Sequence, residues 1–180
     1  MRFAVGEFME NKKCLFVGFK GMKNSSCVLV SELLKESPLR EDGGLKNFCL
    51  LTNSFEGVKK DIEAIDGNYD FVIMFGCDKS LKDCVRLECF AEKDEVKCET
   101  RLDVKLLSET LSRDGVENII SETPAQYLCN EAYWYALQKF EGKAVFVHIP
   151  TLKNIDEIFI SKMKELKNYG ILDGTFKSSR

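Results

Sequence analysis

Two side chains in the C-terminal half of the sequence are of the types that nucleophilic hydrolysis requires. Cys129 opens a predicted helix just after a short apolar strand at residues 118–121, and His148, the single histidine, lies near the end of the next apolar strand. Unpaired N–H groups at a helix N-terminus favour a thiolate, and an imidazole from an adjacent strand end can take the thiol proton. This spacing indicates a nucleophile and its base. The alternative is a small buried cysteine and a structural histidine.

The composition is that of an ordinary globular protein. The chain has 180 residues, of which 44% are apolar and 31% charged, enough for one domain with a sizeable core. We expect a single domain over residues 1–180, with a possible N-terminal arm at 1–12 and a loose tail at 175–180. A net charge of −3 without a concentrated basic face disfavours a nucleic-acid partner. No apolar stretch approaches the length of a membrane span.

The eight cysteines lie mostly inside apolar runs, which predicts reduced, buried thiols. The sequence contains no C-x-x-C and only one histidine, so the common zinc patterns are excluded. A cysteine-only metal site from Cys84, Cys89, Cys98 and one more cysteine is conceivable, but the spacing does not favour it. We therefore predict no metal and a reducing, cytoplasmic compartment.

Strands and helices alternate along most of the chain. Strands are expected at residues 14–19, 48–51, 71–76, 118–121 and 145–149, and helices at 25–34, 54–65, 102–112, 129–137 and 155–169. The alternating segment 85–98 predicts a hairpin or an excursion at the sheet edge. Such alternation implies right-handed βαβ units. We predict an α/β fold, a three-layer α/β/α sandwich of the phosphorylase/hydrolase-like type with a mostly parallel, mixed central sheet.

With these elements in order, the chain resembles the pyroglutamyl peptidase I (pyrrolidone-carboxylate peptidase) family. Residues 121–130, Ser-Glu-Thr-Pro-Ala-Gln-Tyr-Leu-Cys-Asn, resemble that family's nucleophile motif, Ser-Asn-Thr-Ala-Gly-Thr-Tyr-Val-Cys-Asn, and residues 148–150 resemble its His-hydrophobic-Pro motif. Residues 17–19 and 24–26 are similar to its Gly-Phe loop and Asn-Pro-Ser helix start, and residues 101–105 to its Thr-Leu-Pro-Val-Lys helix. The resemblance covers most of the chain.

The resemblance implies a cysteine peptidase that removes an N-terminal pyroglutamyl residue from a small peptide or amide, without metal or organic cofactor. Cys129 would be the nucleophile and His148 the base. Matching the family's Pro-Glu-Arg-Val-Ala-Ile-Asn strand by its valine places Asp83 as the acid of the triad. Glu88 is the alternative, if the register differs by an odd number of residues. Substrate-binding residues expected from the resemblance are Gly18, Phe19 and Met22.

The departures from the family support a second hypothesis. The loop at residues 18–23 keeps one of the family's two pocket aromatics, the substrate loop is reduced to residues 90–100, and Pro124 removes a backbone donor before the nucleophile. A catalytically inactive member retained as a binding or interaction domain is therefore the alternative. A doubly wound domain that binds a phosphate-containing ligand is a third, less favoured one. The family resemblance also allows a homo-oligomer.

Overall fold

The computed structural model describes residues 13–35 and 47–166. The expected N-terminal arm at residues 1–12 and the tail at 175–180 lie outside the described residues. The described chain contains eight strands: β1 (Cys14–Phe19), β2 (Phe48–Leu51), β3 (Phe71–Cys77), β4 (Cys84–Glu88), β5 (Phe90–Lys93), β6 (Val96–Glu99), β7 (Glu117–Ile120) and β8 (Ala144–Ile149). Its helices are α1 (Ser25–Lys35), α2 (Phe55–Glu63), α3 (Val104–Arg113), α4 (Tyr127–Lys139), the short 3₁₀ helix η1 (Leu152–Asn154) and α5 (Glu157–Lys164).

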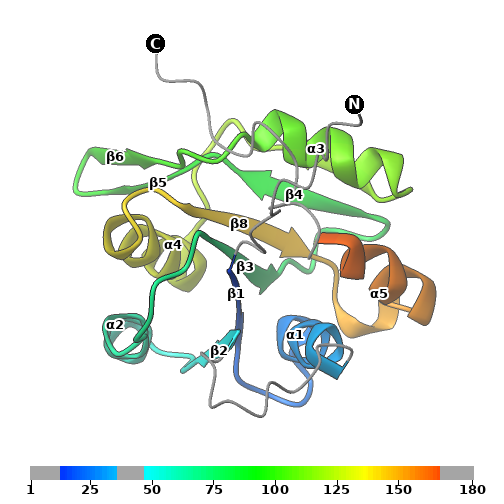
Figure 1. Ribbon diagram of the computed structural model, residues 1–180, viewed down its shortest axis with the longest axis horizontal. Coiled ribbons are helices and arrows are strands. Elements are labelled where there is room, and N and C mark those ends of the chain that lie inside the picture. Colours follow the sequence, from blue (N-terminus) through cyan, green and yellow to red (C-terminus); the bar gives the residue numbers. More distant parts are fainter. Residues whose placement is uncertain (1–12, 36–46, 167–180) are drawn as a thin grey trace, which may run out of the picture.

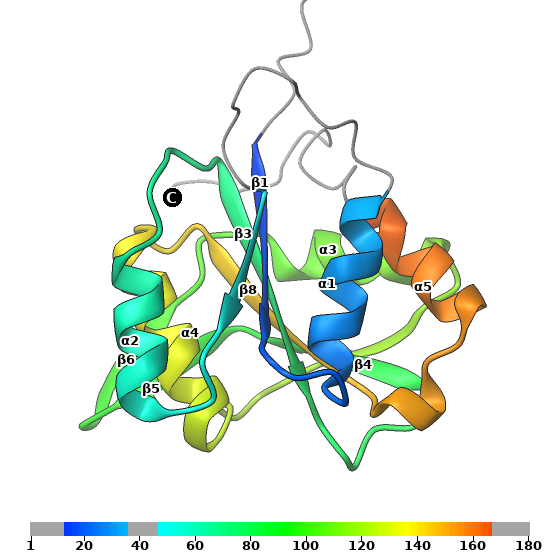
Figure 2. The ribbon, with the colours of Figure 1, turned by 90° about the horizontal axis from the view of Figure 1, so that it is seen from below.

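A six-stranded sheet forms the middle layer, in the order β2-β1-β3-β8-β4-β7. Strands β2, β1, β3 and β8 are parallel to their neighbours, and β4 is parallel to β7, but β4 runs antiparallel to β8. Helices α2 and α4 cover one face, and α1, α3 and α5 cover the other (Figures 1 and 2). The expected mostly parallel, mixed α/β/α sandwich is confirmed.

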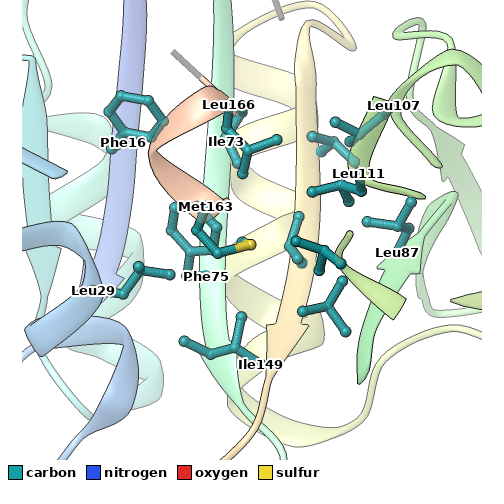
Figure 3. Close-up of a cluster of buried hydrophobic side chains, with 14 of the residues drawn as sticks. Phe16, Leu29, Ile73, Phe75, Leu87, Leu107, Leu111, Ile149, Met163 and Leu166 are labelled. Carbon is teal, nitrogen blue, oxygen red and sulfur yellow. The ribbon is translucent and has the colours of Figure 1, made fainter. Parts of the chain in front are cut away.

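The core is divided by the sheet into two apolar clusters, because successive side chains of a strand point to opposite faces. On β3, Phe71, Ile73 and Phe75 pack toward α1, α3 and α5, whereas Val72 and Met74 pack toward α2 and α4. Figure 3 shows the first cluster, in which side chains from the three helices converge on the strands. A strand that is buried on both faces needs a continuous apolar sequence, which β3 has.

Side-chain caps fix two of the predicted helix starts. The Ser54 hydroxyl accepts a hydrogen bond from the Gly57 N–H at 3.0 Å, and the Asn24 side chain accepts one from the Ser26 N–H at 3.0 Å. Both caps satisfy N–H groups that lack a partner within the helix. Helix α1 then starts directly after β1, at the carboxyl edge of the sheet.

The segment after β3 differs from the expected edge hairpin. Strand β4 inserts between β8 and β7, and only β5 and β6 form a separate antiparallel hairpin, which packs against α4 (Figure 1). The sequence alternation is correct for β4, since Val85 and Leu87 enter the cluster of α1, α3 and α5. The charged side chains of the other face, however, are enclosed by polar partners rather than by water.

Candidate active site

His148 lies on β8, one of the two central strands of the sheet. Its neighbours Val147 and Ile149 pack in the cluster of α1, α3 and α5, so the imidazole projects to the opposite face, with Phe146. The centroids of the Phe146 and His148 rings are 4.9 Å apart. Only 4% of His148 is exposed. A polar ring this deeply buried requires hydrogen-bonding partners from the protein.

Cys129 is in the first turn of α4, on the helix that covers this face. Its sulfur rests against Gly76 of β3: a Cβ added to that glycine would lie 3.0 Å from Sγ. Gly76 is the register partner of His148 in the parallel pairing of β3 and β8. Cys129 and His148 therefore lie over neighbouring strand positions on one face. No hydrogen bond joins the thiol to the ring in the described part of the chain.

The partner of the imidazole is Glu88. Its Oε1 lies 2.8 Å from Nδ1 of His148, and its side chain is 1% exposed. Strand β4 pairs antiparallel with β8, with Arg86 opposite His148, so Glu88 returns to the same face two residues later. A carboxylate only accepts hydrogen bonds, so Nδ1 carries the proton and donates it. In the neutral form of such a ring, the other nitrogen, Nε2, is the one that can act as a base.

Arg86 and Asp78 extend this polar cluster. The Arg86 Nε donates to Oε1 of Glu88 at 3.0 Å, and its Nη2 lies 2.8 Å from Oδ2 of Asp78. Asp78 follows β3 directly and also accepts from the backbone N–H and the hydroxyl of Ser80. These contacts hold the pKa of the Asp78 carboxyl below its ordinary value, despite its burial. The cluster therefore contains two carboxylates with one guanidinium between them.

The placement of the acid corrects the sequence expectation. Asp83 is exposed, in the turn before β4, while Glu88 holds the ring. Asp83 lies two and four residues before Val85 and Leu87, whose side chains pack toward α1, α3 and α5. If β4 extended back to Asp83, this side chain would therefore point to that same layer, away from His148. Glu88, the alternative carboxylate, is the one that contacts His148 in this chain.

The three residues expected to bind substrate have different surroundings. Phe19 is 4% exposed and packs beside Phe146, with ring centroids 6.4 Å apart, so it contacts the neighbour of the imidazole. Gly18 faces α1, where an added Cβ would lie 2.8 Å from the Ser26 carbonyl oxygen. Met22, in the loop after β1, is 93% exposed. Phe19 is thus the one of the three that lies in the layer of Cys129 and His148.

Further contacts that the sequence did not reveal hold helix α4 and Glu88 in place. The Tyr133 hydroxyl, from the middle of α4, donates to the Glu88 carbonyl oxygen at 3.0 Å. Next to the nucleophile, the Asn130 side chain accepts from the Glu92 N–H at 3.1 Å and donates to the Glu92 carbonyl at 2.7 Å. Strand β5 is thereby fastened to the first turn of α4. No local sequence signal predicts these pairs, because their partners are about 40 residues away.

Burial determines the protonation of the thiol. It raises the pKa of Cys129 to about 12, and the negative charges of Glu88, Cys77 and Asp78 act in the same direction, opposed by Arg86. The expectation of a thiolate favoured by the helix N-terminus is therefore wrong for the unliganded protein. A thiol with this pKa is protonated at neutral pH, so a base must remove its proton during attack.

Alkylation of Cys129 should follow this pKa. Since only the thiolate reacts, we expect the rate with iodoacetamide to rise about tenfold per pH unit from pH 7 to 10, without a plateau. Peptide mapping by mass spectrometry, with the other seven cysteines as internal references, measures the rate at each site. A rate at Cys129 that is already constant below pH 8 would indicate a thiolate–imidazolium pair and contradict the expectation.

Gly76 leaves the space in which the sulfur lies. A Cβ there would come within 2.6 Å of the Phe146 ring and 3.0 Å of Sγ. We expect Gly76→Ala to lower the free energy of unfolding by about 1–3 kcal/mol, as overpacking does, and to displace the thiol from His148. Urea unfolding measures the first effect. Adding Phe146→Leu should restore part of the stability by making room; no restoration would mean that the glycine is needed for another reason.

Within residues 13–35 and 47–166, no group of three or more histidine, cysteine, aspartate or glutamate side chains could hold a metal ion. Cys84, Cys89 and Cys98 therefore do not form a metal-binding group there. In the same part of the chain, no helix is both long and apolar enough to cross a membrane.

Comparison with known proteins supports the architecture. No protein-family model matches the sequence, and a search of curated proteins gives no significant match. Solved structures do match, and they show that the chain has the fold of the pyrrolidone carboxyl peptidases, as its motifs predicted.

Three particular structures illustrate the likeness. Pyroglutamyl peptidase I from Bacillus amyloliquefaciens matches with a TM-score of 0.68 and 17% identity, over 92% of this chain and 94% of the other. The pyrrolidone carboxyl peptidase from Thermus thermophilus matches with a TM-score of 0.67 and 18% identity, over 88% and 100% of the two chains. That from Thermococcus litoralis gives 0.61 and 20%, over 94% and 100%. At these identities the likeness establishes the fold.

Proposed function

We propose that the protein is a cysteine hydrolase of the pyroglutamyl peptidase type, a divergent member of that family, which cleaves the amide bond after an N-terminal pyroglutamyl or related residue. The observation that carries the proposal is the 2.8 Å hydrogen bond between His148 Nδ1 and Glu88 Oε1, beside a cysteine in the first turn of a helix. It supports an oriented base next to a nucleophile, on a fold that solved peptidases share.

The proposed reaction uses His148 twice. Nε2 accepts the thiol proton as Sγ of Cys129 bonds to the amide carbonyl carbon. The imidazolium then returns the proton to the leaving amine nitrogen, and the C–N bond breaks to give a thioester. Water attacks the thioester with Nε2 as base, the C–S bond breaks, and the thiol recovers its proton as the acid product leaves. Throughout, Nδ1–H donates to Glu88, which stabilises the imidazolium.

The substrate contacts in this proposal come from the same layer. Phe19 is the candidate wall of the pocket for a flat, uncharged substrate ring. Its ring packs against Phe146, and Phe146 in turn packs against the imidazole of His148. The backbone N–H of Cys129 is the candidate donor for the oxyanion of the tetrahedral intermediate. All eight cysteines are free, which is consistent with a reducing compartment such as the cytoplasm.

A fluorogenic arylamide assay tests the activity. We expect hydrolysis of L-pyroglutamyl arylamide and none of L-prolyl arylamide, which has the same ring without its carbonyl group. The second substrate is the matched control for ring recognition. Trapping of an acylated Cys129 by acid quench and mass spectrometry would identify the nucleophile. Hydrolysis of both amides would argue for a broader amidase, and hydrolysis of neither would remove the peptidase proposal.

One observation favours the inactive alternative. The pKa of Cys129 near 12 makes the unliganded thiol a poor nucleophile. A binding domain that kept the cluster by descent would bind pyroglutamyl peptides without cleaving them. Calorimetric binding of such a peptide by the wild type, with no product on long incubation and no change in affinity in Cys129→Ala, would establish that alternative.

A further inference from the structure

The cluster around His148 contains a pair of charged side chains that the proposed reaction does not use. Arg86 and Asp78 are mostly enclosed, with side-chain exposures of 24% and 20%. Arg86 contacts Asp78 through Nη2 and Glu88 through Nε, so one guanidinium spans two carboxylates. Ion pairs that are partly removed from water cost desolvation energy, and their presence beside an imidazole calls for a functional reason.

Nδ1 of His148 has two neighbours with opposite requirements. The Glu88 Oε1 at 2.8 Å can only accept a hydrogen bond, whereas the Arg86 Nη2 at 3.4 Å can only donate one. If Arg86 donated to Nδ1, the ring proton would be on Nε2, and Nε2 could not take the proton of Cys129. The ring tautomer therefore depends on whether Nδ1 donates to Glu88 or accepts from Arg86.

Asp78 decides this competition by geometry. Its Oδ2 lies 2.8 Å from Nη2, whereas Nδ1 lies 3.4 Å away, so the charged carboxylate is the nearer and stronger acceptor for that nitrogen. The planar guanidinium then presents Nε to Oε1 of Glu88 at 3.0 Å. The second oxygen of Glu88, Oε2, is buried without a hydrogen-bond partner among the described residues. Arg86 and the ring therefore supply the side-chain donors that hold this carboxylate.

Resting on the proposed role of His148 as base, we propose that Arg86, held by Asp78, is a positioning residue that fixes Glu88 against Nδ1 and keeps His148 in the tautomer with Nε2 unprotonated. Arg86 acts through Glu88, and Asp78 acts through Arg86. Cys129 on α4, another titratable side chain on this face, makes no hydrogen bond to the ring in the described structure.

Nitrogen NMR of the histidine ring tests this directly, since the sequence has one histidine and its two ring signals are unambiguous. The protein is labelled with ¹⁵N-histidine, without a histidine tag and without substrate. At a pH where the ring is neutral, we expect a protonated Nδ1 and an unprotonated Nε2 in the wild type. Arg86→Gln should give ring signals averaged between the two tautomers. Lys82→Gln, which removes an equal charge from the exposed turn before β4, should match the wild type.

Kinetics on pyroglutamyl arylamide give an independent measure. Arg86→Gln should lower kcat about 10²-fold with little change in KM, because misplacing the base impairs chemistry rather than binding. Asp78→Asn/Arg86→Gln should equal Arg86→Gln within about twofold, since in this proposal Asp78 positions the ring through Arg86. Arg86→Lys retains the charge without the fork and should lie between wild type and Arg86→Gln. Circular dichroism verifies the folding of each variant.

Several results would overturn the proposal. A wild-type ring with its proton on Nε2, or an Arg86→Gln spectrum identical to that of the wild type, would reject the positioning role. Additive losses in the double variant would reject the action of Asp78 through Arg86. If the protein hydrolyses no amide, the ring spectra still decide the tautomer, so failure of the peptidase proposal is distinguishable from failure of this one.

Discussion

Replacing Glu88 by glutamine is expected to lower kcat for pyroglutamyl amide hydrolysis by about 10³- to 10⁴-fold, in line with the loss of a triad carboxylate elsewhere. Glutamine keeps the shape of the side chain but removes its charge, and its amide can donate to Nδ1. The ring would then carry its proton on Nε2, and the imidazolium formed during attack would lose its counter-charge.

The same substitution should increase the reactivity of the Cys129 thiol toward alkylation, although it lowers kcat. The carboxylate of Glu88 raises the pKa of Cys129, so its removal should lower this pKa and speed alkylation at pH 8 while hydrolysis falls. Asp83→Asn is the matched control, because it removes the same charge from an exposed position five residues earlier; kcat should stay within about twofold of the wild type. A larger loss in Asp83→Asn than in Glu88→Gln would show that the triad is closed by the other acid.

Replacing Cys129 by alanine is expected to have the largest effect, a loss of more than about 10⁴-fold in kcat. The substitution removes the atom that forms the thioester, and neither His148 nor Glu88 can replace it. Arylamide hydrolysis measures the loss, and mass spectrometry should no longer detect an acylated enzyme. Cys27→Ala, on α1 and on the opposite face of the sheet, should retain wild-type activity.

The stability of Cys129→Ala separates chemistry from folding. The sulfur lies in a close-packed place against Gly76, so its removal leaves a small gap, and we expect a decrease of about 1 kcal/mol in the free energy of unfolding. Hydrolysis that survives in Cys129→Ala would assign the activity to another group or to a contaminating enzyme.

The fold could be predicted largely from local signals. The apolar run at residues 71–76 predicted the strand that forms β3, and the helix expected from residue 54 is α2, which Ser54 caps. The placement of Cys129 near the start of a helix was equally local. These features depend on short-range periodicity and capping, which a single sequence records.

The choice between Asp83 and Glu88 as the carboxylate beside His148 could not be made from the sequence, because it depends on which strand β4 adopts as its neighbour. Arg86 and Glu88 alternate with apolar residues and therefore had the pattern of a solvent-facing strand side. Their burial results from antiparallel pairing with β8, a contact between residues about 60 positions apart. The pKa of Cys129 was missed for a related reason: desolvation by the packed layer outweighs the helix N-terminus, and packing is not visible in the sequence.

The antiparallel direction of β4 relative to β8 has a consequence for which residues of β4 can lie beside His148. A carboxylate placed two residues before or after Glu88 on β4 would face the same side of the sheet but lie opposite a different residue of β8. Since a strand rises about 3.3 Å per residue, that carboxylate would lose its contact with His148, so the pairing of β4 with β8 fixes which position can contact the imidazole. In this chain Arg86 and Glu88 are two residues apart on the strand that pairs with β8, so a search for proteins with the same cluster should look for a cation and a carboxylate at this spacing on the strand beside the histidine.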